Sequence, residues 1–141
     1  MKIIIASGFF DPIHVGHIEY LKLAKELGDK LVAILNNDVQ CLLKKDRTFM
    51  REEERVEIVR AIRYVDEVFL SVDKDKSVCE SIRVIAEKYR GNEIIFGKGG
   101  DRFSYEIPET EFCKRLGIKI VDGLGKKIQS SSKLTGLKEI K

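Results

Sequence analysis

The chain has 141 residues, of which 35% are charged and 43% hydrophobic, and its formal net charge is +3. This length suits one domain, the apolar content excludes a disordered chain, and no apolar run approaches the ~20 residues that span a membrane. The positive charge is spread along the chain and tryptophan is absent, whereas a nucleic-acid-binding surface needs a concentrated basic stripe with aromatic partners. We therefore predict a cytoplasmic protein that binds neither nucleic acid nor membrane.

Apolar runs alternate with segments of helical period along the chain. In chain order, the pattern predicts a strand over 2–6, a helix over 16–27, a strand over 30–35, a helix over 52–63, a strand over 67–70, a helix over 76–89, a strand over 93–96, a helix over 108–116, a strand over 118–121 and a helix over 130–139. Such alternation is typical of a parallel sheet with helices on both faces. In these sheets ligands lie beyond the carboxyl ends of the strands, where the strand order reverses. The loops that follow strands are therefore where we expect chemistry.

The loop after the first strand contains both histidines of the chain, in the run Gly8-Phe9-Phe10-Asp11-Pro12-Ile13-His14-Val15-Gly16-His17. His14 and His17 are three residues apart at a helix start, so they can share one face. Unpaired backbone N–H groups and the helix dipole make this position an anion site, and imidazoles can donate to phosphate oxygens. We expect Gly8 to let the chain turn and Gly16 to let a ligand approach the backbone. Two histidines without a third ligand make a poor zinc site, so no protein-held metal is predicted.

Three later features also favour phosphate contact. The run Gly97-Lys98-Gly99-Gly100-Asp101-Arg102 follows the fourth strand and fits neither the Walker nor the dinucleotide pattern. The run Gln129-Ser130-Ser131-Ser132-Lys133 has more hydroxyls than one helix cap needs. Lys44 and Lys45 lie in an expected loop after the second strand.

The three cysteines, Cys41, Cys79 and Cys113, lie far apart, with no Cys-x-x-Cys pattern and no histidine nearby. This spacing is typical of reduced thiols, and we predict structural roles for all three.

The run from Gly8 to His17 resembles the H-x-G-H signature of the nucleotidyltransferase superfamily, which includes cytidylyltransferases and several adenylyltransferases. The Lys44 region, the run Glu53-Glu54-Arg55-Val56, residues 62–68, the loop 98–101 and the late serines have counterparts in the same order. The resemblance covers nearly the whole chain and implies one nucleotidyltransferase domain over residues 1–141. It implies an α/β fold with a Rossmann-like, doubly wound, five-stranded parallel sheet of order 3-2-1-4-5 and helices on both faces. Strands one and four would then be neighbours, which places their two loops side by side.

The resemblance also implies a reaction. A small phosphate monoester attacks the α-phosphorus of CTP or ATP, and pyrophosphate leaves. The nucleophile is already an anion, so no general base is needed. The work is to hold two anions in line and to stabilise the leaving charge. Mg²⁺ would be carried by the nucleotide rather than by protein ligands.

Roles for single residues follow from the same resemblance. His14, His17 and Lys44 would be catalytic. Asp11 would also orient a cation or a magnesium-bound water. The acceptor would contact Lys44, Lys45 and Arg55, although a structural ion pair within Glu53-Glu54-Arg55 is the alternative for Arg55. The expected nucleotide contacts are Gly8, Phe9, Phe10, Asp11, His14, Gly16, His17, Lys98, Gly99, Gly100, Asp101, Arg102, Gln129, Ser130, Ser131 and Ser132.

The substrates stay open at this point. Phe9 stands where many superfamily members have Thr or Ser, and residues 125–132 lack an arginine that glycerol-phosphate cytidylyltransferases carry. The Lys98-Gly99-Gly100-Asp101 loop is similar to the heptose-phosphate adenylyltransferase branch, so a sugar or polyol phosphate is the favoured acceptor. The competing hypotheses are a nucleotide-binding regulatory module without catalysis and a fragment of a class I aminoacyl-tRNA synthetase core. A homodimer is among the states that the resemblance allows.

Overall fold

The computed structural model describes residues 1–99 and 108–124, apart from the side chain of Lys45. Within these residues, five strands and five helices occur in the order β1 (Lys2–Gly8), α1 (Val15–Glu26), β2 (Lys30–Leu35), α2 (Asp38–Lys45), α3 (Glu52–Arg60), β3 (Glu67–Leu70), α4 (Cys79–Lys88), β4 (Glu93–Gly99), α5 (Glu109–Leu116) and β5 (Lys119–Leu124). The expected helix over 130–139 lies outside the described residues. None of the helices in the described part of the chain has the length and apolar character needed to cross a bilayer.

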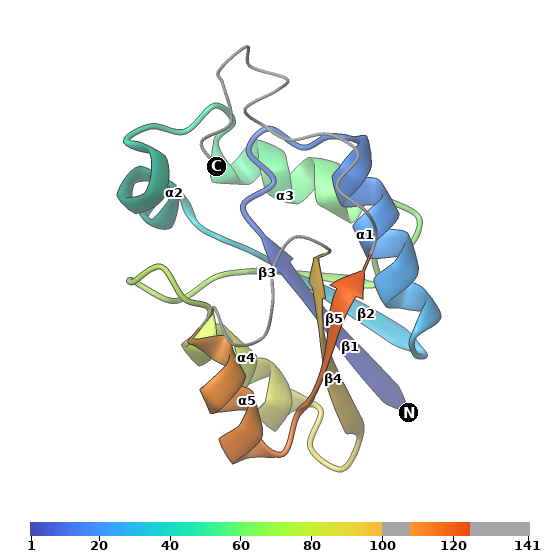
Figure 1. Cartoon of the computed structure of the whole chain (residues 1–141). Helices are drawn as coiled ribbons and strands as arrows, with labels where there is room; N and C mark the ends of the chain where they lie inside the picture. The colour runs from blue at the N-terminus through green and yellow to red at the C-terminus, as the bar shows by residue number, and fades with distance from the viewer. Residues whose placement is uncertain (100–107, 125–141) are drawn as a thin grey trace.

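The strands form one sheet of order β3-β2-β1-β4-β5, in which every neighbouring pair is parallel (Figure 1). This confirms the expected α/β fold and its strand order. β1 lies at the centre, with β2 and β3 on one side of it and β4 and β5 on the other. The sheet therefore has its switch point between β1 and β4.

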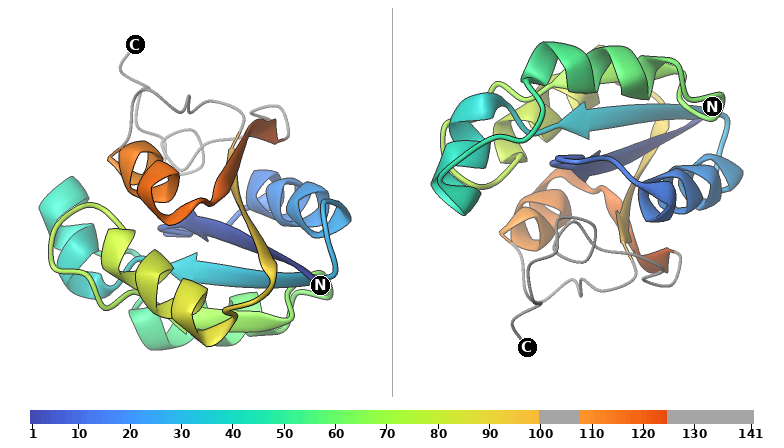
Figure 2. Two further views of the ribbon diagram at one scale, coloured as in Figure 1. Left: turned by 90° about the horizontal axis from the view of Figure 1, so that it is seen from below. Right: turned by 90° about the horizontal axis from the view of Figure 1, so that it is seen from above.

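Helices cover both faces of the sheet, as the two views in Figure 2 show. Ile3 and Ile5 of β1 pack on the face covered by α4 and α5, whereas Ile4 and Ala6 pack on the face covered by α1 and α3. Both sides of β1 are consequently buried, and a strand buried on both sides is apolar throughout. That is why this strand appears in the sequence as an uninterrupted apolar run.

Helix α2 is an element that the sequence analysis did not predict, because residues 38–45 were expected to be a loop. The Asn37 side chain accepts a hydrogen bond from the Gln40 N–H at 2.9 Å, and the Gln40 side chain accepts one from the Asn37 N–H at 3.1 Å. This reciprocal capping box starts the helix. Lys44 therefore lies on the last turn of a helix rather than in a loop.

Helix α4 begins later than expected, at Cys79 instead of residue 76. Asp75 accepts a hydrogen bond from the Ser77 N–H at 2.9 Å, which favours a local turn over a helix. Asp73 then accepts from the N–H groups of Glu80 and Ser81, at 2.8 and 3.0 Å, and so caps the helix from outside. Residues 76–78 therefore belong to a turn held by Asp73 and Asp75, although the helical period of the sequence includes them.

Candidate active site

The switch point between β1 and β4 is bridged by one tyrosine. Ala6 and Gly97 are the last residues of the two strands in register. Next to this last pair, the Tyr20 hydroxyl accepts from the Ser7 N–H at 3.1 Å and donates to the Gly97 carbonyl at 2.6 Å. A side chain from α1 thus takes the place of a direct strand-to-strand hydrogen bond. The loops that follow β1 and β4 leave the sheet on either side of this bridge.

The two histidines cap helix α1. The Gly16 N–H donates to His14 Nδ1 at 3.1 Å, and the His14 N–H donates to His17 Nδ1 at 3.0 Å. A ring nitrogen that accepts a hydrogen bond carries no proton, so the proton of each neutral imidazole is on Nε2. The helix start therefore holds two rings whose Nε2–H groups are donors, next to the positive end of the helix dipole. The sequence analysis predicts an anion site at this helix start, and the geometry of the two rings suits one, but anion binding here stays a prediction.

The rings are held against each other and against Phe10. The His14 and His17 rings are stacked with centroids 4.0 Å apart, and His17 meets the edge of Phe10 at 4.8 Å. Burial lowers the pKa of His14 below its ordinary value of 6.5, which favours the neutral ring at neutral pH. A Cβ on Gly8 would lie 3.1 Å from the Phe10 ring. The need for glycine at this position is therefore close packing rather than the expected turn.

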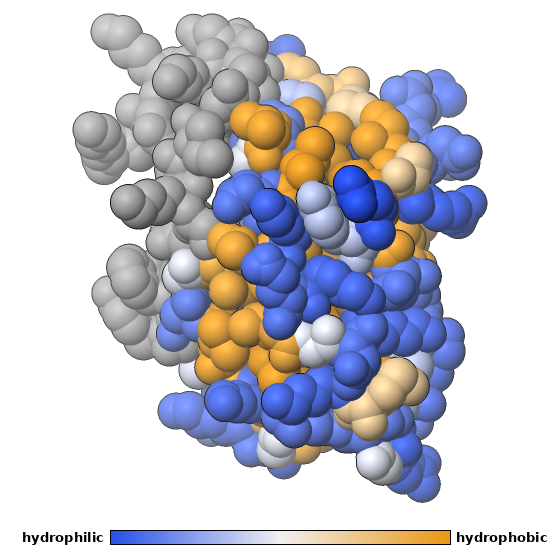
Figure 3. Space-filling model, turned by 90° about the vertical axis from the view of Figure 1, so that its right-hand side faces the viewer, coloured by the Kyte–Doolittle hydropathy of each residue, from blue (hydrophilic) through white to orange (hydrophobic). Residues whose placement is uncertain are grey.

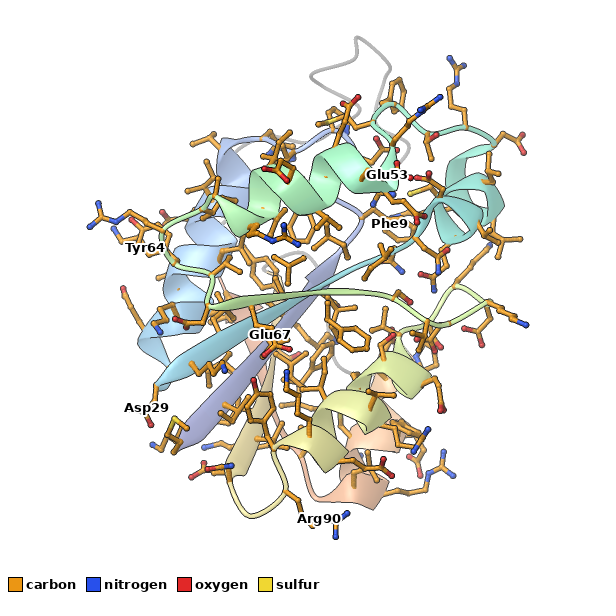
Figure 4. The ribbon with its side chains drawn as sticks, turned by 180° about the vertical axis from the view of Figure 1, so that it is seen from behind. Phe9, Asp29, Glu53, Tyr64, Glu67 and Arg90 are labelled. Carbon is orange, nitrogen blue, oxygen red and sulfur yellow. The ribbon has the colours of Figure 1, made fainter. Side chains whose placement is uncertain are left out.

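Lys44 contacts Phe9, at the start of the loop that carries the histidines. Its Nζ lies 4.3 Å from the centroid of the Phe9 ring, so helix α2 places a cation over the residue that follows β1. In Figure 4, Phe9 and Glu53 lie near one end of the sheet and Asp29 and Arg90 near the opposite end. The carboxyl end of β1, the start of α3 and Lys44 on α2 therefore belong to the same end of the molecule.

Arg55 is placed differently from expectation. Its side chain is fully buried, and the guanidinium donates to the carbonyls of Phe9, Asn36 and Met50 and to the Asp38 carboxylate. A group without exposed surface does not touch a substrate, so the structure contradicts the acceptor contact. The alternative, an ion pair within residues 53–55, is also wrong, because the partner is Asp38 on α2 at 2.8 Å.

Asp11 is also turned inward. Only 1% of it is exposed, and its carboxylate accepts from the N–H groups of Phe49 and Met50. This carboxylate holds the segment that follows α2, and the expected contact with a cation or a magnesium-bound water stays a prediction.

The end of β4 carries the other described part of the expected site. Lys98 is 97% buried, with Nζ 3.5 Å from the Asp122 carboxylate of β5. Gly99 pairs with Leu124 at the end of the sheet. Residues Gly100, Asp101, Arg102, Gln129, Ser130, Ser131 and Ser132 and the side chain of Lys45 lie outside the described part of the chain.

Two residues of this region were not singled out from the sequence, Tyr20 and Asp38. Tyr20 lies on the buried side of α1 with Leu21 and Ala24. A hydroxyl on an otherwise apolar helix face, one turn after His17, is the signal that marks it. Asp38 had no such signal, because its partner Arg55 is distant in sequence.

Cys41 lies on α2 with Lys44, whereas Cys79 and Cys113 lie on α4 and α5. All three are free thiols, and Cys41 and Cys113 are buried. Burial raises the pKa of the Cys113 thiol to about 12 and also raises that of Cys79. Thiols of this kind are unreactive, consistent with the structural roles expected for them. Within residues 1–99 and 108–124, no group of three or more His, Cys, Asp or Glu side chains is placed to hold a metal ion.

Comparisons with known proteins agree with this geometry. Residues 5–120 match the family described as cytidylyltransferase-like. The chain is 47% identical over 118 residues to a Pyrococcus abyssi protein named FAD synthase, which covers 83% of the chain and 75% of that protein. It is 34% identical over 122 residues to the bifunctional protein HldE of Desulfatibacillum aliphaticivorans, which covers 85% of the chain but only 23% of HldE.

Other matches are shorter or structural. For some relatives named FAD synthase the matched segment has 68 residues and covers 46% of the relative. Among solved structures, the lipopolysaccharide core biosynthesis protein of Thermoplasma volcanium has a TM-score of 0.68 and 27% identity, over 89% of this chain and 98% of that one.

Proposed function

The chain belongs to the cytidylyltransferase-like family and is a nucleotidyltransferase, and from this premise we propose that it transfers AMP from ATP to the phosphate of FMN, which yields FAD and pyrophosphate. The observation that carries the proposal is the 47% identity to a FAD synthase over 118 residues. On this ground we favour FMN over a sugar or polyol phosphate as the acceptor, and ATP over CTP as the nucleotide.

The reaction makes one bond and breaks one bond. A phosphate oxygen of FMN attacks the α-phosphorus of ATP, and the bond from that phosphorus to the oxygen bridging to the β-phosphate breaks. The electron pair leaves with pyrophosphate. Because a phosphate monoester carries about −1.5 to −2 charge at pH 7, the attacking oxygen needs no base. The protein must bring two anions into line and stabilise the charge that develops on the leaving oxygen.

The described residues supply groups for both tasks. The Nε2–H groups of His14 and His17 would donate to triphosphate oxygens, at a helix start that already favours anions. The Lys44 ammonium would approach the FMN phosphate and the α-phosphate together. Mg²⁺ would arrive bound to ATP, as is usual for hard cations at triphosphate sites.

The surroundings of Lys44 favour an acceptor with a large apolar part. Leu42 and Leu43 are each 50% exposed and Phe49 is 44% exposed, and all three lie near Lys44 in the chain. An isoalloxazine ring would gain from burying such side chains, whereas a sugar would gain from hydrogen-bonding groups. A sugar phosphate is the second candidate, favoured by the 34% identity to HldE and by the resemblance of the loop that begins at Lys98.

The test is a matrix of substrates in the presence of Mg²⁺. ATP and CTP are each combined with FMN, heptose 1-phosphate and glycerol 3-phosphate, and pyrophosphate release and FAD formation are both measured. We expect ATP with FMN to exceed every other pair in kcat/KM by about 100-fold or more, a difference of about 2.7 kcal/mol in transition-state binding. Pyrophosphate release with a sugar phosphate and none with FMN would replace FMN by the second candidate. Tight ATP binding without release from any pair would favour a regulatory module.

A further inference from the structure

Two segments that carry site residues are joined by a dense set of hydrogen bonds. One is the loop after β1, with Phe9 and Asp11, and the other is the connection from α2 to α3, with Phe49 and Met50. Asp11 accepts from the Met50 N–H at 2.6 Å, and Arg55 donates from Nε to the Met50 carbonyl at 3.0 Å. Both the N–H and the carbonyl of Met50 are thus held by buried charged side chains.

Arg55 extends this network to two further segments. Its Nη1 donates to the Phe9 carbonyl at 2.8 Å and to the Asn36 carbonyl at 2.6 Å, and its Nη2 donates to Asp38 at 2.8 Å. Its acceptors therefore come from the loop after β1, the residue after β2, the start of α2 and the segment that precedes α3. A planar guanidinium with fixed donor directions sets the relative positions of these four segments, which a flexible ammonium would not do.

The burial of this network indicates that it serves geometry rather than stability. Arg55 has no exposed surface and Asp11 has 1%. Apolar residues of similar volume often stabilise a protein as well as a buried ion pair does, because charges lose hydration when they are buried. The feature that apolar packing would not reproduce is the directional connection between the two segments.

We propose that Arg55 and Asp11 are positioning residues that set the distance between Lys44 and the pair His14 and His17. The link to Lys44 runs through helix α2, whose first residue is bound by Arg55, and through Phe9, whose carbonyl is bound by Arg55 and whose ring lies under Lys44. The inference rests on the proposed function, in which Lys44 brings the acceptor phosphate to the α-phosphate held at the histidines. A displacement of about 1 Å in such an arrangement can cost a reaction about 10²-fold in rate.

A double-mutant cycle tests this coupling. The variants are Arg55→Lys, Lys44→Ala and the combination of both. We expect Arg55→Lys to lower kcat by about 10- to 100-fold when Lys44 is present and by less than about 3-fold when Lys44 is already Ala, because residues that act as a unit are not additive. The KM for ATP should change by less than about 3-fold, since the hydrogen bonds that orient His14 and His17 do not involve Arg55. Equal losses in both backgrounds would overturn the proposal.

Controls separate positioning from general destabilisation. Arg60→Lys makes the same change on the exposed side of the same helix, where the side chain is 67% exposed, and should leave kcat unchanged. Asp38→Asn keeps an oxygen acceptor for Arg55 and offers a milder perturbation if Arg55→Lys does not fold. It should follow the same pattern in the cycle, with a smaller effect. A drop in kcat for Arg60→Lys as large as that for Arg55→Lys would count against a specific role of Arg55.

Amide hydrogen exchange gives a readout that does not depend on turnover. The Phe49 and Met50 N–H groups, which donate to Asp11, should exchange faster in Arg55→Lys, while the Val32 N–H in the centre of the sheet should not. If the wild-type chain turns over no substrate pair, the proposed function fails and the exchange data alone decide whether the network fixes the two segments. If the wild-type chain is active but exchange at Phe49 and Met50 does not change, the positioning role is wrong and the proposed function stands.

Discussion

At the scale of single residues, His14 and His17 use their ring nitrogens in the same way. Each Nδ1 accepts a backbone N–H of the loop, which leaves Nε2–H as the donor of both neutral rings. The hydrogen bonds that cap α1 therefore also orient the two Nε2–H groups that we propose as donors to the triphosphate. Changes at His14 or His17 should alter helix capping and chemistry together, and different experiments separate the two.

We expect His17→Ala to lower kcat by about 10²- to 10³-fold, the usual cost of losing one donor to a developing negative charge. The measurement is steady-state pyrophosphate release with the active substrate pair. Lys22→Ala, an exposed change one to two turns further along the same helix, serves as the control and should retain turnover. Full activity of His17→Ala would remove this residue from the mechanism.

The pH dependence of stability should carry the signature of His14. Burial lowers its pKa in the folded state, so the unfolded chain binds the proton more tightly and folding loses stability as the pH falls below 6.5. Protonation of Nδ1 would also remove the acceptor of the Gly16 N–H. We expect His14→Asn, an N-capping residue that does not titrate, to lose this decline between pH 7 and pH 5. Urea unfolding at several pH values measures it, and an unchanged decline would show that another group is responsible.

The sequence points to the histidines, Lys44 and the loop after β4 as candidate phosphate contacts, because few side chains suit phosphate, and these roles stay predictions. It did not determine which way Arg55 points, since a guanidinium binds a buried carbonyl as readily as a phosphate. The orientation follows from the helix period: Arg55 lies four residues before the buried Val59 and so shares its inward face. Applied to charged as well as apolar positions, the same period would have placed it correctly.

At the scale of elements, periodicity predicted all five strands and the helices of the described chain except α2. Helix α2 was missed because its apolar residues Val39, Leu42 and Leu43 are exposed rather than packed on the sheet. The sequence after β2 therefore lacks the apolar spacing of a helix with one buried face. The signal that the sequence does contain is the Asn37 to Gln40 spacing, which is typical of a capping box. Strand order did not follow from periodicity and came from the resemblance to the superfamily.

Tyr20→Phe tests the bridge between β1 and β4. The change removes one oxygen and leaves the Ser7 N–H and the Gly97 carbonyl without this partner. We expect a loss of about 1 to 3 kcal/mol in the free energy of unfolding, the cost of unsatisfied buried polar groups. Denaturant unfolding measures it, with Tyr64→Phe, on the loop before β3, as the comparison. No loss of stability would mean that the two strands close up and pair directly when the hydroxyl is absent.

At the scale of the whole molecule, Asp66 joins three parts of the fold. Its carboxylate accepts from Lys25 of α1 at 2.5 Å and from the Leu31 N–H of β2 at 2.8 Å, and it immediately precedes β3. Burial acts to raise the pKa of Asp66, but these hydrogen bonds outweigh it and the pKa is lowered. Stability from this contact is therefore present above the ordinary value of 3.8 and is lost as the pH falls through the lower folded pKa.

We expect Asp66→Asn to be less stable than the wild-type chain at pH 7, with the difference shrinking once the pH falls below 4. Thermal unfolding across pH 2 to 7 measures the difference. Glu57→Gln, at a carboxylate that is 80% exposed, should show no comparable change. A difference that stays constant down to pH 2 would mean that charge at Asp66 does not contribute.

The molecular surface mixes charged residues with apolar groups, as Figure 3 shows for one side. Exposed apolar residues include Val15 and Ile18 on α1, which are 49% and 41% exposed, and Ile58 on α3, which is 39% exposed. The homodimer that the superfamily resemblance allows stays a prediction, and light scattering of the purified chain over a range of concentrations measures it directly.

The central position of β1 has a consequence for synthesis on the ribosome. β1 is the first strand of this chain to be made, yet one of its two neighbours, β4, begins only at Glu93. At 5–20 residues per second, the interval between the end of β2 at Leu35 and the start of β4 is roughly 3 to 12 seconds. During that time an apolar strand has an unpaired edge, which is the kind of surface that chaperones bind and that drives aggregation. Nascent chains stalled before residue 93 should therefore bind chaperones more strongly than chains stalled after the sheet is complete.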